Sequence, residues 1–263
     1  MIIDTHCHLN DDRYNDDFAD MLARASEAGV RGYIIPGADP RELEKACKIA
    51  HEFDDVYFAA GVHPYDIEYF DLDYLVKFMS DSKCIAVGEC GLDYFRFPKD
   101  EAAKQSEKSE QKRVFIAQIE LAIKFNKPLI VHSREANEDT YQILAQYADD
   151  LKSAVLHCYN SSPRLLELAN LGHFYYGIGG VLTFKNAKSL VEILPQIPKD
   201  RLLIETDAPY LTPEPFRGQR NEPSYTDLVA KKIGELLNLS KDEVCEITTA
   251  NAYRAFDGLK GEA

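Results

Sequence analysis

The sequence has few features that would mark an exported or membrane-bound protein. No C-x-x-C spacing occurs among its six cysteines, and its start carries neither a basic segment nor a long apolar run. Scattered cysteines without an export signal indicate reduced thiols rather than a disulfide framework, and no apolar run is long enough to cross a membrane. We therefore expect a cytoplasmic protein with no membrane segment.

Basic residues are also in short supply. The 263 residues include 30 Lys and Arg against 44 Asp and Glu, a formal net charge of -14. That balance argues against a broad surface that coats nucleic acid, because such surfaces are basic. It leaves a small phosphate-binding site open, since bound metal ions set the local charge that a polyanion meets.

What the sequence does contain is an alternation of β-rich runs and amphipathic stretches. Eight strands, each followed by a helix, predict an α/β protein with a closed (β/α)8 or TIM barrel, in one domain over residues 1–263. An open doubly wound sheet is the alternative, but the count of eight and the absence of a Gly-rich phosphate fingerprint favour the barrel. The runs are residues 2–8, 32–37, 56–63, 84–93, 128–134, 154–159, 174–180 and 202–207.

One connection is longer than the others. Residues 95–110, between the fourth and fifth runs, are largely polar and precede an amphipathic stretch at 111–126. Such a polar run is typical of a solvated loop or a helix start. Because it follows the carboxyl end of a strand, a partial lid over the barrel's mouth is a further interpretation.

Metal-binding side chains end five of the eight runs. His6 and His8 lie two residues apart, so a β-strand would present them on one face. The carboxyl ends of the strands are where TIM-barrel enzymes keep their chemistry. Because six ligands exceed the needs of one tetrahedral ion, we expect a two-metal centre with Glu89 as the bridge. The six candidate ligands are His6, His8, Glu89, His132, His157 and Asp207.

Side chains alternate between the two faces of a strand, and this parity also predicts in which direction the neighbours of these ligands point. Cys7, Cys90 and Cys158 each follow a ligand, so we expect them to point toward the helices as small apolar fillers. Asp4 and Glu205 share the parity of their ligands and are predicted to point inward, where each would accept a hydrogen bond from a ligand imidazole. Salt bridges unrelated to the metals are the alternative.

A set of short motifs follows in order along the whole chain. The motifs are Asp4-Thr-His-Cys-His8, Gly61-Val-His-Pro64, Gly88-Glu-Cys-Gly-Leu-Asp93, Val131-His-Ser-Arg134, His157-Cys158, Gly180-Val-Leu-Thr-Phe184, Glu205-Thr-Asp-Ala-Pro-Tyr-Leu211 and Arg217-Gly-Gln-Arg-Asn-Glu-Pro223. This ordered set resembles the TatD family of metal-dependent deoxyribonucleases, within the amidohydrolase-like barrels. After His157-Cys158 that family usually has Phe-Ser-Gly, whereas Tyr159-Asn160-Ser161 follows here, and Cys90 stands where a small apolar residue is common.

The resemblance implies a division of roles. One ion would be held by His6, His8, Glu89 and Asp207, and the other by Glu89, His132 and His157. His63 matches the family's histidine near the scissile phosphate, with a structural histidine as the alternative. Arg134 and Arg217 would contact phosphate. For Arg217 and Arg220, which lie in one loop, the alternative is an ordinary surface charge. The general base would be Asp207 or a hydroxide held by the ions.

The expected function is divalent-metal-dependent hydrolysis of phosphodiester bonds in DNA, as a 3'-5' exonuclease on single strands. The alternative is a two-metal hydrolase of a small phosphodiester, amide, ester or lactone, because fold alone does not set the substrate. A non-catalytic metal-binding scaffold would predict a broken ligand set, whereas this set is intact. Mixed imidazole and carboxylate ligands suit Mg, Mn or Zn. A monomer is the default expectation.

Overall fold

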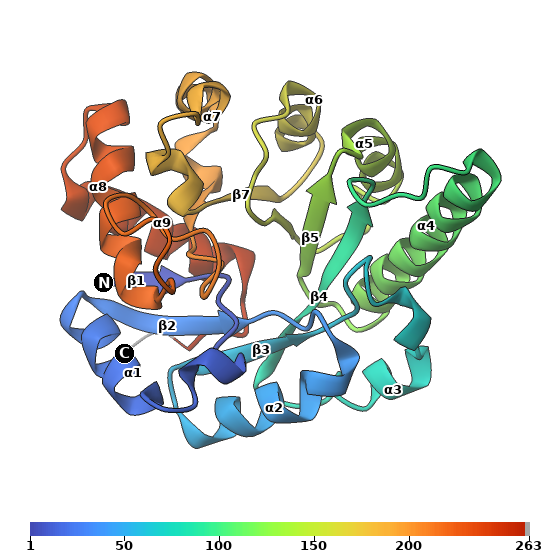
Figure 1. Ribbon diagram of the computed structural model, residues 1–263, viewed down its shortest axis with the longest axis horizontal. Coiled ribbons are helices and arrows are strands. Elements are labelled where there is room, and N and C mark those ends of the chain that lie inside the picture. The colour runs from blue at the N-terminus through green and yellow to red at the C-terminus, as the bar shows by residue number, and fades with distance from the viewer. Residues whose placement is uncertain (261–263) are drawn as a thin grey trace.

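Eight parallel strands form the centre of the structure, which is a computed structural model describing residues 1–260. Each strand pairs with the next in chain order and is followed by a helix on the outside (Figure 1). The strands are β1 (Ile2–Asp4), β2 (Val30–Ile35), β3 (Val56–Ala60), β4 (Cys84–Asp93), β5 (Leu129–Arg134), β6 (Ala154–Leu156), β7 (Phe174–Ile178) and β8 (Leu202–Ile204). The α-helices of the described residues are α1 (Phe18–Glu27), α2 (Leu43–Glu52), α3 (Leu72–Val76), α4 (Glu101–Lys124), α5 (Asn137–Gln146), α6 (Pro163–Leu166), α7 (Lys188–Ile193), α8 (Thr226–Leu237) and α9 (Lys241–Ala255).

The barrel closes between β1 and β8. The Thr5 amide donates to the Ile204 carbonyl at 3.2 Å, and Cys7 forms an isolated parallel bridge with Ala208. These contacts join the two ends of the strand order, so the closed (β/α)8 barrel is confirmed and the open doubly wound sheet is wrong. The predicted single domain over residues 1–263 includes residues 261–263, which lie outside the described part of the chain.

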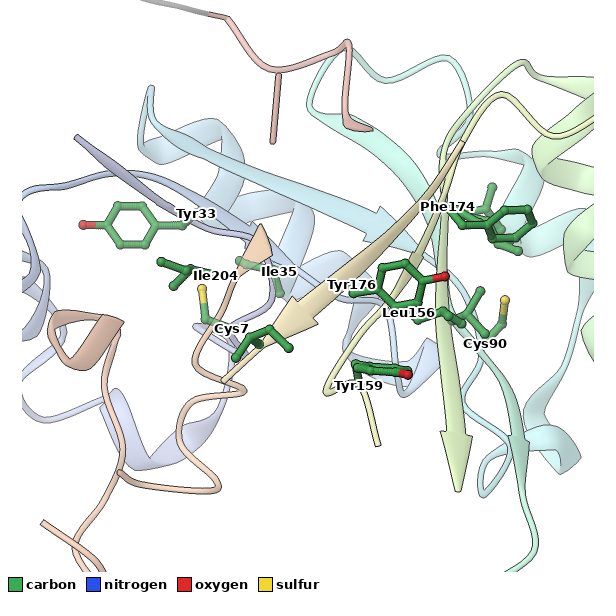
Figure 2. Packing of buried hydrophobic residues seen from close by; sticks show 14 of the residues in the cluster. Cys7, Tyr33, Ile35, Cys90, Leu156, Tyr159, Phe174, Tyr176 and Ile204 are labelled. Carbon is green, nitrogen blue, oxygen red and sulfur yellow. The ribbon is translucent and has the colours of Figure 1, made fainter. Parts of the chain in front are cut away.

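A large apolar cluster fills the layer between the strands and the surrounding helices (Figure 2). Tyr33, Leu156 and Phe174 are buried in it, as are Cys7 and Cys90. The prediction that these two thiols are apolar fillers on the outer side of the strands is therefore confirmed.

A second apolar cluster fills the inside of the barrel at its amino-terminal end. Ile3, Ile130 and Leu203 contribute from the strands, and Phe256 contributes from the end of α9. The helix is fastened across this end by hydrogen bonds, such as the one from Ser153 Oγ to the Ala255 carbonyl at 2.6 Å. Side chains thus close the amino-terminal end of the barrel and leave the carboxyl end for polar groups.

Two boundaries differ from the sequence-based expectation. β1 ends at Asp4, so His6 and His8 lie in the segment after the strand rather than within it. The polar residues 101–110 belong to α4, which begins at Glu101 and is capped by Asp100 through its hydrogen bond with the Ala103 amide. Most of the longer connection is therefore a helix start, and its loop is confined to residues 94–100.

Within residues 1–260, no helix combines the length and the apolar character that crossing a bilayer requires.

Candidate metal centre

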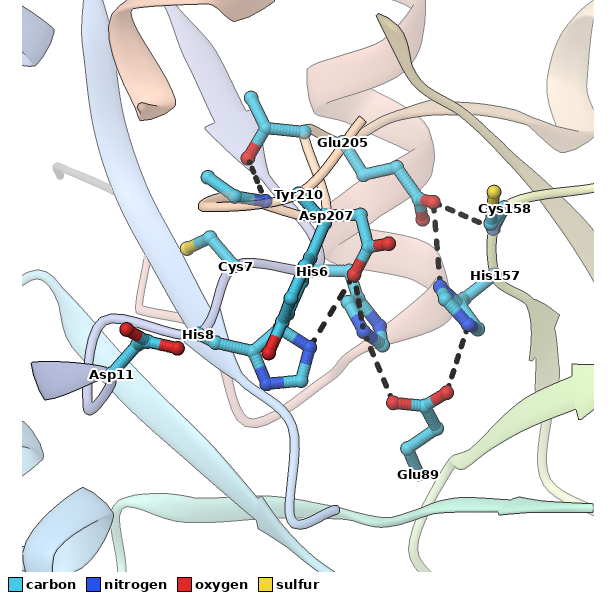
Figure 3. A network of polar contacts seen from close by, with 12 residues as sticks. His6, Cys7, His8, Asp11, Glu89, His157, Cys158, Glu205, Asp207 and Tyr210 are labelled. Atoms are coloured by element: carbon cyan, nitrogen blue, oxygen red, sulfur yellow. Dashed lines mark hydrogen bonds and ion pairs between the residues drawn. The ribbon is translucent and has the colours of Figure 1, made fainter. Parts of the chain in front are cut away.

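Glu89 lies at the centre of a group of histidines in the barrel's mouth (Figure 3). Its Oε1 atom is 2.9 Å from His157 Nε2 and 3.0 Å from His132 Nδ1. Its Oε2 atom is 3.3 Å from His6 Nε2. The two oxygens of one buried carboxylate therefore face two different sets of imidazoles.

Asp207 completes the side of the mouth that holds the first two histidines. Its Oδ1 atom lies 3.3 Å from His8 Nε2 and 3.6 Å from His6 Nε2. Candidate ligand atoms of His6, His8 and Glu89 all lie within 4.8 Å of one another.

The candidate ligand atoms of Glu89, His132 and His157 form a second group of this kind. All six predicted ligands thus converge on one mouth, in two groups that share Glu89.

The mouth contains buried polar atoms that make no hydrogen bond. His6 is fully buried, yet neither Nδ1 nor Nε2 makes a hydrogen bond among the described residues, although Nε2 lies 3.3 Å from Glu89 Oε2. An unsatisfied buried polar atom costs about 1–3 kcal/mol. A cation between Glu89, Asp207 and His6 would satisfy Nε2, and nitrogen and carboxylate oxygen are donors that suit Zn, Mn and related ions. The residues therefore fit a divalent metal centre.

The charges in the mouth favour a cation as well. Burial alone would raise the pKa of Glu89, but His157 and His6 outweigh burial and hold that pKa well below its usual range. Burial would lower the pKa of His157, but Glu89 and Glu205 raise it well above the ordinary value. A proton on His157 thus supplies the positive charge that a bound ion would supply instead.

Asp93 contacts one candidate ligand, His132, and sequence reasoning missed it. Its Oδ2 atom lies 3.0 Å from His132 Nε2, and the side chain is buried. An Nε2–H donated to Asp93 leaves the Nδ1 lone pair of His132 directed at Glu89 and His157. Parity was the signal in the sequence: Asp93 lies four residues beyond Glu89 on β4, so both side chains are expected on the same face of the strand.

Glu205 takes the predicted position beside a ligand. Its Oε1 atom is 3.5 Å from His157 Nδ1 and accepts a hydrogen bond from the Cys158 amide at 2.6 Å. It therefore reaches the imidazole nitrogen that faces away from Glu89.

Asp4 does not take the predicted position. Its carboxyl group contacts the His6 amide, the Thr206 amide and the Thr206 hydroxyl, at 3.3, 3.0 and 2.6 Å, and no imidazole. Burial raises the pKa of Asp4 to about 8. The inward neighbour on β1 is Ile3 rather than Asp4, because β1 ends before His6 and the strand period does not continue to that ligand. Asp4 thus fastens β1 to the segment after β8.

His63 lies at the edge of the ligand groups. Its Nε2 atom is 3.8 Å from Glu89 Oε1, and its Nδ1 atom accepts a hydrogen bond from the Tyr65 amide at 3.1 Å. An Nδ1 that accepts carries no proton, so the neutral ring bears its hydrogen on Nε2. Burial lowers the pKa of His63 to about 3, which favours this neutral form.

The three arginines singled out in the sequence have different environments. Arg134 is exposed beside His132, in the wall of the cavity described below, and its guanidinium lies 3.6 Å from the centre of the Phe95 ring. Arg217 lies 3.8 Å above the Phe184 ring and outside that wall.

Arg220 donates to Asp17 at 2.6 and 2.7 Å and is held in that ion pair. Of these three arginines, only Arg134 therefore lies next to the groups of candidate ligands.

A cavity of about 530 Å³ opens beside the ligands. His132, His157 and Asp207 form one side of its wall. Cys158 lies in the same wall, in a left-handed backbone conformation with φ 42°. The prediction that Cys158 is a filler behind the ligands is therefore wrong, because the strand geometry on which parity depends ends at Leu156.

A further group of metal-capable side chains lies outside the mouth. Cys47 and His51 are one turn apart on α2, and Asp81 follows α3, with His51 Nε2 2.9 Å from Asp81 Oδ2. The structure explains this group as a polar contact that joins α2 to the loop between α3 and β4.

Comparison with known proteins agrees with the geometry. The family model described as TatD related DNase matches residues 3–257. The chain is 40% identical to the Bacillus subtilis (strain 168) protein named "Uncharacterized metal-dependent hydrolase YabD", over 97% of this chain and 99% of that protein. It is 33% identical to the Escherichia coli (strain K12) protein named "3'-5' ssDNA/RNA exonuclease TatD", over 97% and 98%. The crystal structure of YJJV, a TatD homologue from Escherichia coli K12, superposes with a TM-score of 0.87 at 29% identity, over 97% and 98%.

Proposed function

Because the chain belongs to the TatD-related DNase family of metal-dependent hydrolases, we propose that it hydrolyses phosphodiester bonds of DNA, as a 3'-5' exonuclease on single strands. The observation that carries the proposal is the sharing of Glu89 between two groups of candidate ligands. That arrangement would suit two ions that both bind one phosphate group of the substrate. The Escherichia coli relative named as an exonuclease on single-stranded DNA and RNA supports the substrate class.

We propose His6, His8, Glu89 and Asp207 as ligands of one divalent ion, and Glu89, His132 and His157 as ligands of the other. Ions held there would supply an activated water and would stabilise charge on the attacking and leaving oxygens. Glu205 and Asp93 would each hold one imidazole in the orientation that ligation requires.

The remaining roles belong to side chains that border the ligands. The Nε2–H of neutral His63 can donate to a phosphoryl oxygen, and the guanidinium of Arg134 matches phosphate geometry. Asp207 can accept the proton of the attacking water because it is ionised. His8, His157 and His6 hold the pKa of this carboxylate below its ordinary value despite burial. Arg217 would contact phosphate only at a greater distance from the ions.

The test is cleavage of a single-stranded oligonucleotide labelled at either end, with added Mn²⁺, Mg²⁺ or Zn²⁺. We expect stepwise shortening from the 3' end, abolished by a chelator. Glu89→Gln should lower kcat/KM by at least about 100-fold, because loss of an outer partner of a metal ligand already costs 10- to 100-fold. Glu246→Gln, an exposed position on α9, is the matched control.

RNA, a small phosphodiester, an amide and a lactone complete the substrate panel. Hydrolysis of one of these with no cleavage of DNA would contradict the proposed substrate. Full activity of Glu89→Gln would contradict the proposed centre. A cytoplasmic location and a monomeric state stay predictions from the sequence, which fractionation and size-exclusion chromatography would check.

A further inference from the structure

The cavity beside the ligands has a second side that the proposed chemistry does not use. Resting on the proposed function, we propose that this cavity binds one unpaired nucleobase of the substrate and that Tyr210 stacks on that base. The base and the scissile phosphate would then occupy adjoining parts of one site, because His157 and Asp207 belong to the same wall as Tyr210.

The composition of the wall suits a flat heterocycle. Away from the ligands it is formed by Val181, Leu190 and Tyr159, with Tyr159 fixed by a hydrogen bond from its hydroxyl to the Ser162 carbonyl. A volume of about 530 Å³ is in the range of sites that enclose a small ligand. Such sites combine apolar walls with a few placed polar groups.

Tyr210 is an exposed aromatic ring in a fixed position. Its side chain is 47% exposed, and it is one of six large hydrophobic residues exposed among residues 1–260. The segment that carries it is held by hydrogen bonds from the Tyr210 amide to the Asp207 carbonyl and from Asn221 Nδ2 to the Tyr210 carbonyl.

The ring also has polar neighbours. It stands edge-on to His8, with centroids 5.7 Å apart (Figure 3). The Arg13 guanidinium lies 4.4 Å from the centre of the Tyr210 ring. An exposed ring at the edge of a cavity beside a charged site is the arrangement on which unpaired bases stack.

The polar edge of a base would also meet a suitable group. Asn186 lies in the wall, is exposed, and its side-chain amide makes no hydrogen bond within residues 1–260. By contrast, Asn160 in the same wall already donates to the Ser133 carbonyl and to Asn137. Asn186 therefore offers both a donor and an acceptor, as the edge of a nucleobase does.

Charge explains why stacking matters here. With a net charge of -14, the chain gains little of the salt-dependent attraction by which basic proteins hold DNA. Apart from the ligands, Arg134 is the charged residue of the cavity wall. Contacts to the bases would add affinity that the surface charge does not supply, and a base is free to stack on a side chain when it is unpaired.

The experiment combines substitutions of Tyr210 with the removal of one base from the DNA substrate. Wild type, Tyr210→Ala and Tyr210→Phe are assayed on an intact single-stranded oligonucleotide and on copies with one abasic residue at the 3'-terminal or the next nucleotide. We expect the wild type to prefer intact DNA over one abasic copy by about 5- to 100-fold in kcat/KM. Tyr210→Ala should lose that preference mainly through KM, and Tyr210→Phe should keep it.

Tyr69→Ala is the matched control. Tyr69 is 41% exposed and carries the Arg41 guanidinium 4.0 Å above its ring, but it lies outside the cavity wall. This variant should behave as wild type. Equal losses by Tyr210→Ala on intact and abasic DNA, or no loss on either, would overturn the inference while leaving the nuclease intact. Failure of the wild type to cleave any of the oligonucleotides would instead contradict the proposed function.

Discussion

The two ends of this barrel are built from the same strands and hold opposite kinds of side chain. The amino end is filled by apolar residues of the strands and covered by α9. The carboxyl end holds imidazoles and carboxylates, some of whose buried atoms make no hydrogen bond among the described residues. One end is therefore built for stability and the other for binding a cation.

The distance between the two environments is one pleat. On β5, Ile130 lies in the inner apolar cluster and His132 lies in the mouth. β6 repeats the step with Val155 and His157. Because successive inward residues of a strand are two apart, these two strands each place a packed apolar residue directly below a candidate ligand. The apolar layer thus fixes the position of the polar one.

The largest effect on stability is expected at the amino end. Phe256→Ala removes a buried ring between α9 and the strands, which should lower the free energy of unfolding by about 3–5 kcal/mol. Urea denaturation monitored by circular dichroism measures the change. The folded enzyme should keep its kcat/KM at temperatures well below unfolding. A proportional loss of kcat/KM there would break the separation between the two ends.

Metal binding should be the next largest contribution to stability, and it should come from the other end. A divalent ion at 100 times its Kd raises the free energy of unfolding by about 2.7 kcal/mol. Thermal unfolding with Mn²⁺ and with excess chelator measures the difference. Metal binding should raise the free energy of unfolding of Phe256→Ala by the same amount as that of the wild type, because distant sites act additively. No stabilisation by any divalent ion would contradict the centre.

Asp93→Asn tests the orientation of one ligand. We expect a 10- to 100-fold loss of metal affinity or activity, about 1.4–2.7 kcal/mol, because the carboxylate that aligns His132 loses its charge. Metal titration by calorimetry measures it. Asp227→Asn, a carboxylate paired with lysines at α8 and α9, is the control and should bind metal normally.

The smallest effect concerns the helix that covers the amino end. Ser240 and Glu243 form a capping box at the start of α9. Ser240→Ala should cost about 1 kcal/mol of stability and leave activity unchanged. Ser109→Ala, in the middle of α4, is a suitable comparison because its hydroxyl caps no helix end. Equal losses from the two variants would show that the box does not stabilise α9.

The sequence predicted the barrel and the convergence of six candidate ligands because both follow from local patterns. An apolar run ends where the strand reaches the mouth, so a polar residue there is placed by the run itself, as with His132 on β5 and His157 directly after β6. Parity failed where regular strand geometry had already ended, as it did for Asp4 and Cys158.

Other features depend on the tertiary arrangement. Parity along β4 directs Asp93 inward, but its pairing with His132 requires knowing the register between β4 and β5, which no local pattern gives. The ion pair of Arg220 with Asp17 joins residues far apart in the chain. The early start of α4 was hidden because residues 101–110 lack the apolar periodicity that marks the helix from residue 111 onward.

The most direct measurement is an anomalous difference map from crystals grown with Mn²⁺. The account predicts two peaks in the mouth that share Glu89, one beside His6 and His8 and the other beside His132 and His157. A single peak there, or peaks confined to the Cys47–His51–Asp81 group, would contradict it.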